Sequence, residues 1–161
     1  MIDHTSTLSV TTPSDVEVRV TRVFDAPRRL VFQALTTPDI LKQWMHGPNG
    51  WTLAVCEVDL RAGGTFRYVW RKVDGREMGA GGAFRVVEPP HRLIHSELFD
   101  DDWTGGEAEV TTELDEHDGT TTLTVTMRYA SKAGRDAALS TNFTAGMAAS
   151  YDALAALLAA G

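Results

Sequence analysis

Apolar and polar residues alternate along two parts of the chain, the pattern of a half-buried β-strand. The first part runs from Val16 to about Phe24 and places a valine at every second position up to Val20. The second runs from residue 52 to 130, where turn sequences such as Asp74-Gly75 and Asp118-Gly119 divide it into six strands. Both dipeptides are strong hairpin signals. The pattern therefore predicts an antiparallel meander of seven strands with one dry face and one solvated face.

Three other segments have the apolar spacing of helices. Two short ones, at about 27–35 and 37–47, each begin with a proline in the first turn. The third runs from Ser131 to about Ala159, with apolar residues three or four positions apart, and predicts one continuous C-terminal helix. A glycine inside a helix, such as Gly146 here, lowers the stability of the helix by about 1 kcal/mol relative to alanine. Close backbone approach or room for a ligand would explain that glycine.

The order of these elements predicts an α+β fold in which the antiparallel sheet wraps around the long C-terminal helix. Such a sheet leaves space beneath the helix wherever side chains are small, so we expect a cavity there. The glycines between Gly79 and Gly82 are interpreted as strand curvature or as room for this cavity. The chain of 161 residues is long enough for one core. Residues 1–15, rich in Ser and Thr, are predicted to be a mobile tail, and residues 16–161 a single domain.

Composition and charge exclude several classes of protein. Fifteen basic against 22 acidic residues give a formal charge of -7, which disfavours nucleic acid as a partner. The longest apolar run, Ala153 to Ala160, is shorter than the roughly 20 residues that span a bilayer, so no membrane span is expected. Cys56 is the only cysteine, which fits a reducing compartment. The N-terminus lacks the pattern of a signal peptide. We therefore expect a cytoplasmic protein, monomeric or homodimeric.

Several short motifs resemble a known family. They include Phe24-Asp25-Ala26-Pro27, Val58-Asp59-Leu60-Arg61-Ala62-Gly63-Gly64, Glu88-Pro89-Pro90-His91-Arg92-Leu93, and Trp44 followed by Gly47-Pro48. These motifs occur in the same order along the chain as in the AHSA-type group, the homologues of the activator of the heat-shock-protein ATPase. The sequence is similar to that group over about residues 16–160. That group lies within the START-like, helix-grip superfamily (SRPBCC). The resemblance implies a seven-stranded sheet gripping a C-terminal helix, with a deep apolar pocket between them.

The resemblance also bears on function. Members of the superfamily bind lipids, sterols, polyketides or hormones, and some cyclise or hydrolyse their ligands. The group takes its name from a co-chaperone, whose activity we do not transfer to this chain. One departure is local: where the family often has Trp-Trp-Gly-Pro, Met45 and His46 lie here between Trp44 and Gly47.

Metal, nucleophile and phosphate sites find little support in the sequence. His91 and His95 have the spacing of a zinc helix, but on a strand that spacing separates them by about 13 Å. Cys56 lies in an alternating strand, where a buried structural thiol is expected. The Gly79–Phe84 segment lacks the third glycine and the following helix of a dinucleotide-binding loop. We therefore predict no metal and no cofactor.

The clearest polar candidates are His95, Glu97 and Glu107, on two neighbouring predicted strands. If His95 and Glu97 faced inward, a carboxylate in a dry cavity would have a raised pKa and could act as a general base. If Ile94, Ser96 and Leu98 faced inward instead, both polar groups would be solvated. Hydrophobicity slightly favours this second arrangement. The same two alternatives apply to Glu107.

The leading hypothesis is a protein that binds a small apolar or amphipathic molecule, of lipid, polyketide or aromatic type, between sheet and helix. An enzyme of cyclase, lyase or hydrolase type is the first alternative, and a co-chaperone-like interaction module is the second. Aromatic and methionine side chains are the candidate ligand contacts: Trp44, Trp51, Tyr68, Trp70, Met78, Phe143, Met147 and Tyr151.

Overall fold

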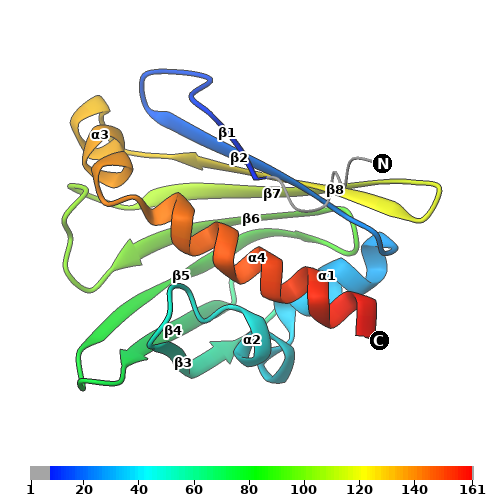
Figure 1. Cartoon of the computed structure of the whole chain (residues 1–161). Coiled ribbons are helices and arrows are strands. Elements are labelled where there is room, and N and C mark those ends of the chain that lie inside the picture. Colours follow the sequence, from blue (N-terminus) through cyan, green and yellow to red (C-terminus); the bar gives the residue numbers. More distant parts are fainter. Residues whose placement is uncertain (1–7, 161) are drawn as a thin grey trace.

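A computed structural model describes residues 8–160 of the chain, which form an antiparallel sheet with helices packed against one face (Figure 1). The elements in chain order are β1 (Ser9–Thr11), β2 (Glu17–Phe24), α1 (Arg28–Thr36), α2 (Pro38–Trp44), β3 (Trp51–Val58), β4 (Thr65–Lys72), β5 (Glu77–Glu88), β6 (Arg92–Phe99), β7 (Ala108–His117), β8 (Thr120–Arg128), α3 (Lys132–Ser140) and α4 (Phe143–Ala160). The strand order is β1-β2-β8-β7-β6-β5-β4-β3.

Tight turns produce the predicted meander from β3 to β8. At the β7–β8 turn, Asp118 and Gly119 have φ values of 51° and 77°. Positive φ at both central residues matches the right-handed twist of the two strands, and Asp-Gly tolerates it well. Gly75 adopts a φ of 94° in the β4–β5 turn. Both hairpins predicted from the sequence are therefore confirmed, and the α+β class with a helix-covered sheet is confirmed with them.

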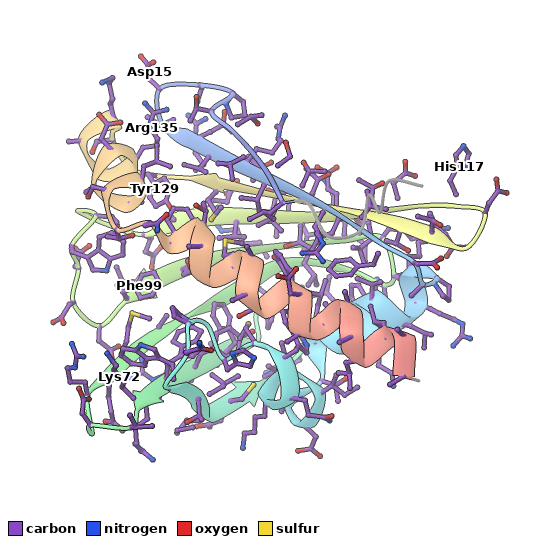
Figure 2. All side chains as sticks on the ribbon, in the orientation of Figure 1. Asp15, Lys72, Phe99, His117, Tyr129 and Arg135 are labelled. Carbon is purple, nitrogen blue, oxygen red and sulfur yellow. The ribbon has the colours of Figure 1, made fainter. Side chains whose placement is uncertain are left out.

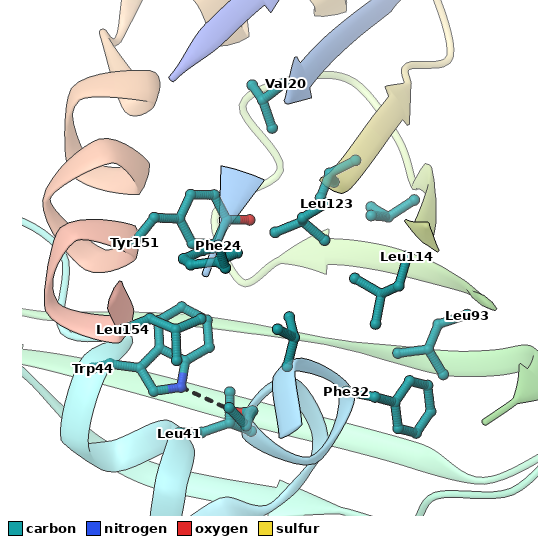
Figure 3. Close-up of a cluster of buried hydrophobic side chains, with 14 of the residues drawn as sticks. Val20, Phe24, Phe32, Leu41, Trp44, Leu93, Leu114, Leu123, Tyr151 and Leu154 are labelled. Carbon is teal, nitrogen blue, oxygen red and sulfur yellow. Dashed lines mark hydrogen bonds between the residues drawn. The ribbon is translucent and has the colours of Figure 1, made fainter. Parts of the chain in front are cut away.

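The dry face of the sheet packs against the C-terminal half of α4 and the two short helices (Figure 3). Trp44, at the end of α2, stacks on Tyr151 of α4 with ring centroids 5.8 Å apart, and Phe24 of β2 meets Tyr151 edge-on at 5.9 Å. The Trp44 indole donates a hydrogen bond to the carbonyl oxygen of Ala34 at 3.0 Å. Trp44 is 2% exposed and holds α1, α2 and α4 together.

The sheet has one strand more than the sequence predicted. Residues 9–11, placed in the expected tail, form β1 and pair antiparallel with Arg19–Thr21 of β2. Arg135 of α3 also donates a hydrogen bond to the carbonyl oxygen of Ser14 at 2.8 Å, which ties the β1–β2 connection to α3. The tail prediction is therefore wrong for residues 9–11. Residues 1–7 lie outside the described residues.

The C-terminal helix is broken, not continuous as predicted. The break falls between α3 and α4, where Asn142 has a φ of 58°. The hydroxyl groups of Ser140 and Thr141 donate hydrogen bonds to the carbonyl oxygens of Ala137 and Ala138, both at 2.7 Å. Such side-chain bonds compete with helical backbone pairing. Asn tolerates the left-handed conformation that redirects the chain, so α3 and α4 pack as separate helices.

Candidate functional site

The register of β6 settles which of its side chains face α4. His95 pairs opposite Val110 of β7 and Glu97 opposite Ala108, and both β7 residues are buried on the dry face. Leu98, on the other face of β6, is 39% exposed. The sequence-based preference for Ile94, Ser96 and Leu98 as the inward set was therefore wrong.

A local feature of β5 explains this orientation of β6. The β5–β6 register shifts between Phe84 and Val86, and at this irregularity the Ser96 hydroxyl accepts a hydrogen bond from the Ala83 amide at 3.0 Å. Ser96 is thus buried on the outer face because it satisfies a backbone donor released by the bulge. That pairing turns His95 and Glu97 toward the helix.

Small residues in β5 allow side chains from β4 and β6 to meet across it. Ala80 and Gly82 pair with Tyr68 and Phe66 of β4. Because Gly82 has no side chain, the Phe66 ring reaches His95 of β6, with ring centroids 4.8 Å apart. A Cβ on Gly82 would collide with the carbonyl oxygen of Ser96. Gly82 therefore permits close approach of neighbouring groups, which differs from the strand curvature or cavity space that the sequence suggested.

Glu97 is the acidic group at the centre of this face. Burial raises its pKa from 4.5 to about 7, with no neighbouring cation to oppose the shift. Three tyrosines lie near enough for the Glu97 charge to affect their pKa: Tyr68 from β4, Tyr129 just after β8, and Tyr151 from α4. Burial raises the pKa of each hydroxyl, and the Glu97 carboxylate raises it further. The tyrosines are therefore neutral, and Glu97 is the group that can change charge near neutral pH.

The polar atoms of Glu97, Tyr68 and Tyr151 have no hydrogen-bond partner in the described part of the chain and are not completely shielded from solvent. Among residues 8–160, Arg22 Nε is the only buried side-chain nitrogen or oxygen that lacks a hydrogen-bond partner. Within the same residues the Glu97 carboxylate and the Tyr68 and Tyr151 hydroxyls also make no hydrogen bond, so they remain unburied atoms. In Figure 3 the Tyr151 hydroxyl points away from α4, toward the strands. A ligand or water can therefore reach them.

The loop from Met45 to Gly50 connects the sheet to the middle of α4. The Trp70 indole of β4 donates a hydrogen bond to the carbonyl oxygen of Met45 at 2.9 Å. The Gly47 amide donates to the Ser150 hydroxyl of α4, also at 2.9 Å. A Cβ on Gly146 would lie 3.3 Å from Pro48. Close approach to this loop is therefore the reason for a glycine within α4.

His46 belongs to this loop, and its contacts are local. Its ring Nδ1 lies 2.8 Å from the carbonyl oxygen of the neighbouring Gly47. The side chain is half-buried. The Met45-His46 departure from the family pattern thus lies in the segment tied to Trp70 and Ser150.

The predicted contact residues divide into two groups. Trp44 and Tyr151 are buried at 2% and 6% exposure in the closed core, although the Tyr151 hydroxyl remains accessible. The others are half-buried or exposed toward the N-terminal half of α4 and the nearby strand ends: Trp51, Tyr68, Trp70, Met78, Phe143 and Met147. In Figure 2, Tyr129, Phe99 and Lys72 lie at this end of the sheet, and His117 at the opposite end. Accessible apolar surface is therefore concentrated where α4 begins.

Other candidates from the sequence lie elsewhere. Glu107 is exposed and borders a surface hollow of about 230 Å³ with Arg85 and Arg128. A second hollow, of about 540 Å³, is bordered by residues that include His91 and Glu113. Neither hollow is lined by a residue of α4. The Glu107 carboxylate is thus solvated, which removes the reason to consider it as a cavity acid.

Metal and thiol chemistry are not favoured by the geometry. Within residues 8–160, no group of three or more His, Cys, Asp or Glu side chains is arranged to hold a metal ion. Cys56 is buried, and burial raises the pKa of its thiol to about 11. Since the thiolate is the nucleophile, this cysteine is unreactive at neutral pH.

Two residues of the site region were not among the candidate site residues of the sequence. Tyr129 continues the period of two from Val125 and Met127, which places it on the dry face even though the strand has ended. Arg22 occupies an inward position of β2, is 2% exposed, and donates a hydrogen bond to the Asp152 carboxylate of α4 at 2.8 Å. The alternation along β8 already predicted a dry-face position for Tyr129, whereas the charge of Arg22 concealed its inward position.

Comparison with known proteins gives the family. The model for "Activator of Hsp90 ATPase homolog 1-like protein" (AHSA1) matches residues 25–159. The chain belongs to the AHSA1-like family. This places it in the SRPBCC helix-grip superfamily, whose domains generally form a ligand-binding cavity. By length and composition α4 could cross a membrane, with a mean hydropathy of 1.3 over 18 residues. In the AHSA1-like fold it is the C-terminal core helix.

Solved structures agree with this assignment. An uncharacterised protein from Rhodobacter sphaeroides is 36% identical, with a TM-score of 0.90 over 96% of this chain and 99% of that chain. The AHSA1 protein from Silicibacter pomeroyi is 26% identical, with a TM-score of 0.72 over 89% and 97%. An HSP90 activator from Plasmodium falciparum is 24% identical, with a TM-score of 0.55 over 71% and 73%, and shows the fold alone. No curated protein matches the sequence.

Proposed function

We propose that this AHSA1-like protein binds a small apolar or amphipathic molecule between the N-terminal half of α4 and strands β4 to β6. The observation that carries the proposal is the group of polar atoms that lie between the sheet and α4 without a hydrogen-bond partner among residues 8–160, in an otherwise apolar interior. A few convergent polar groups among aromatic side chains are the usual composition of a small-molecule site. Here Glu97 and the Tyr68 and Tyr151 hydroxyls provide the polar groups.

The side chains around Glu97 are consistent with such a site. Gly82 and Ala108 flank Glu97 on the neighbouring strands, and neither carries a polar side chain that could pair with it. Phe143 and Met147 of α4 are only half-buried, although both are apolar and lie over this region. A ligand that covered them would gain about 25 cal/mol for each Å² of apolar surface removed from water. Removing this half-buried apolar surface from water therefore favours the binding of an apolar molecule.

An NMR titration with N-phenyl-1-naphthylamine, a neutral apolar dye, tests both binding and its location. We expect amide shifts concentrated at Tyr68, Glu97 and Met147, with an accompanying rise in dye fluorescence. Shifts confined to the hollow near His91 and Glu113 would place binding elsewhere. Absence of any shift up to the solubility limit of the dye would refute the proposal.

Acid–base catalysis is a second candidate, and the pKa of Glu97 favours it. Burial raises this pKa to about 7, near the optimum for a general base at neutral pH. For an uncharged molecule that is bound and converted, Glu97→Gln should abolish turnover while the dissociation constant changes less than about threefold. Glu107→Gln removes an exposed acid and serves as the control. Turnover that survives Glu97→Gln would exclude Glu97 as the base.

We further infer that the protein acts in the cytoplasm, because its lone cysteine fits a reducing compartment. Chaperone binding has weaker support. Only the family description and the Plasmodium falciparum neighbour suggest it, and the exposed large apolar side chains are dispersed over several elements: Val10, Leu60, Val73, Met78, Leu98 and Trp103.

A further inference from the structure

The charge of the interior restricts the kind of ligand. Glu97 faces α4 from β6, and within residues 8–160 no Lys or Arg lies within ion-pair distance of it. The nearest buried base, Arg22, is engaged by Asp152 at 2.8 Å. Lys72 lies at the rim, over the Trp51 ring at 6.0 Å. The ionised Glu97 carboxylate therefore lacks a counter-charge, and a ligand is the remaining source of one.

Aromatic rings supply the rest of the surroundings. Tyr68 packs against Trp70 with ring centroids 5.8 Å apart, and Phe99 packs against Trp103 at 5.6 Å. Tyr129 and Tyr151 approach Glu97 from the end of β8 and from α4. The face of an aromatic ring carries negative potential and attracts organic cations, most strongly where water is excluded. Both the acid and the rings therefore favour a positively charged group.

Three kinds of ligand head group can be compared at this position. A carboxylate or phosphate would be repelled by Glu97. A hydroxyl would form an ordinary hydrogen bond with it. An ammonium group would form a charge-assisted bond, about twice as strong as a neutral one, and would also interact with the aromatic faces.

We propose that the site takes a lipophilic amine, with its ammonium group paired to Glu97 and its apolar part beneath α4. This inference rests on the proposed function, since it names the chemical class of ligand for the same site.

The titration of the surrounding groups supports this pairing. Tyr68, Tyr129 and Tyr151 stay neutral because burial raises their pKa, and His95 on β6 stays neutral because burial lowers its pKa. On the neighbouring strands, Gly82 and Ala108 carry no charge. Glu97 is thus the group whose charge changes between pH 6 and 8, because its pKa is about 7. An alkylamine, with a pKa near that of lysine at about 10, remains protonated over this range.

The test uses two sets of matched probes: octylamine, octan-1-ol and octanoate, and 2-naphthylmethylamine, 2-naphthylmethanol and 2-naphthoate. Isothermal titration calorimetry at pH 7.5 measures their affinities for the wild-type protein. In at least one set, the amine should bind tenfold or more tightly than the alcohol, and the acid should bind most weakly. Amine affinity should rise about tenfold from pH 6 to 8 as the ionised fraction of Glu97 grows, whereas alcohol affinity should stay constant.

Glu97→Gln keeps the shape of the side chain and removes its charge. In this variant the amine should lose tenfold or more in affinity, while the alcohol changes less than threefold. Glu107→Gln, the matched change at an exposed acid, should leave all affinities unaltered. An alcohol or acid that binds at least as tightly as its amine in both sets would overturn the amine inference but keep the proposed function. An amine preference that survives in Glu97→Gln would also overturn the inference. If no probe of either set bound, the proposed function would fail as well.

Discussion

Glu97 should make the stability of the ligand-free protein depend on pH. The pKa of its carboxyl is about 7 in the folded protein, against an ordinary value of 4.5. The folded state therefore holds this proton more tightly than the unfolded state does. Between pH 4.5 and 7 the unfolded chain releases the proton first, so stability falls as pH rises, by about 1.4 kcal/mol per pH unit. Over the whole interval this amounts to about 3 kcal/mol, and it stays constant above pH 7.

Glu97→Gln removes the titration while keeping the shape of the side chain. At pH 5 the variant should be more stable than the wild-type protein by less than about 1 kcal/mol, because Glu97 is neutral in the folded state and pH 5 lies only just above the pKa of 4.5 at which it ionises in the unfolded chain. At pH 8 the variant should be more stable by about 3 kcal/mol, which corresponds to a rise in Tm of roughly 6–12 °C for a domain of this size. Urea denaturation followed by tryptophan fluorescence at pH 5, 6, 7 and 8 measures the difference.

The control is Glu107→Gln, whose effect on stability should be small at every pH because that side chain is exposed. If the difference between Glu97→Gln and the wild-type protein did not grow from pH 5 to 8, Glu97 would not be a buried acid. That result would also remove the electrostatic basis of the proposed amine site.

Three further substitutions test the packing that forms the site. Gly82→Ala should destabilise the fold by about 3 kcal/mol or more in urea denaturation, because the new Cβ meets the backbone oxygen of Ser96 and cannot be accommodated by a rotamer change. Ser131→Ala should cost about 1 kcal/mol, since its hydroxyl caps α3 by accepting from the Gly134 amide at 3.0 Å. Asp152→Ala should lower Tm more than Arg22→Met does, because the first leaves a buried guanidinium unpaired and the second removes it.

The sequence predicted most of the sheet because a period of two is a local signal. Each strand from β2 to β8 was anticipated, as were the Asp-Gly hairpins. β1 was not, since three residues are too few to show a period and Ser9–Thr11 acquires its structure only by pairing with β2. The break at Asn142 was also missed, because the apolar spacing of four continues from Leu139 to Phe143 and Met147 across it. Hydroxyl bonds to the backbone ended α3 without disturbing that spacing.

The site was harder to predict than the fold because its orientation depends on a partner strand. The two faces of β6 differ little in hydrophobicity, and hydrophobicity favoured the wrong one. What decides the orientation is the irregularity in β5, which places the Ala83 amide where only the Ser96 hydroxyl satisfies it. Such a hydrogen bond joins residues from two different strands and does not alter the hydrophobic periodicity in the sequence of either strand. Tyr68, on a strand with a strong period, was by contrast assigned to the interior correctly.

A buried acid without a partner is difficult to explain as packing. A glutamine or leucine at position 97 would avoid the loss of about 3 kcal/mol that ionisation brings at neutral pH. Costs of this kind persist mainly where a functional interaction requires the group. A ligand cation that pairs with Glu97 would lower its pKa and recover the stability lost on ionisation. Amine binding should therefore stabilise the protein more at pH 8 than at pH 6, and the thermal shift with octylamine, compared with octan-1-ol, measures that difference.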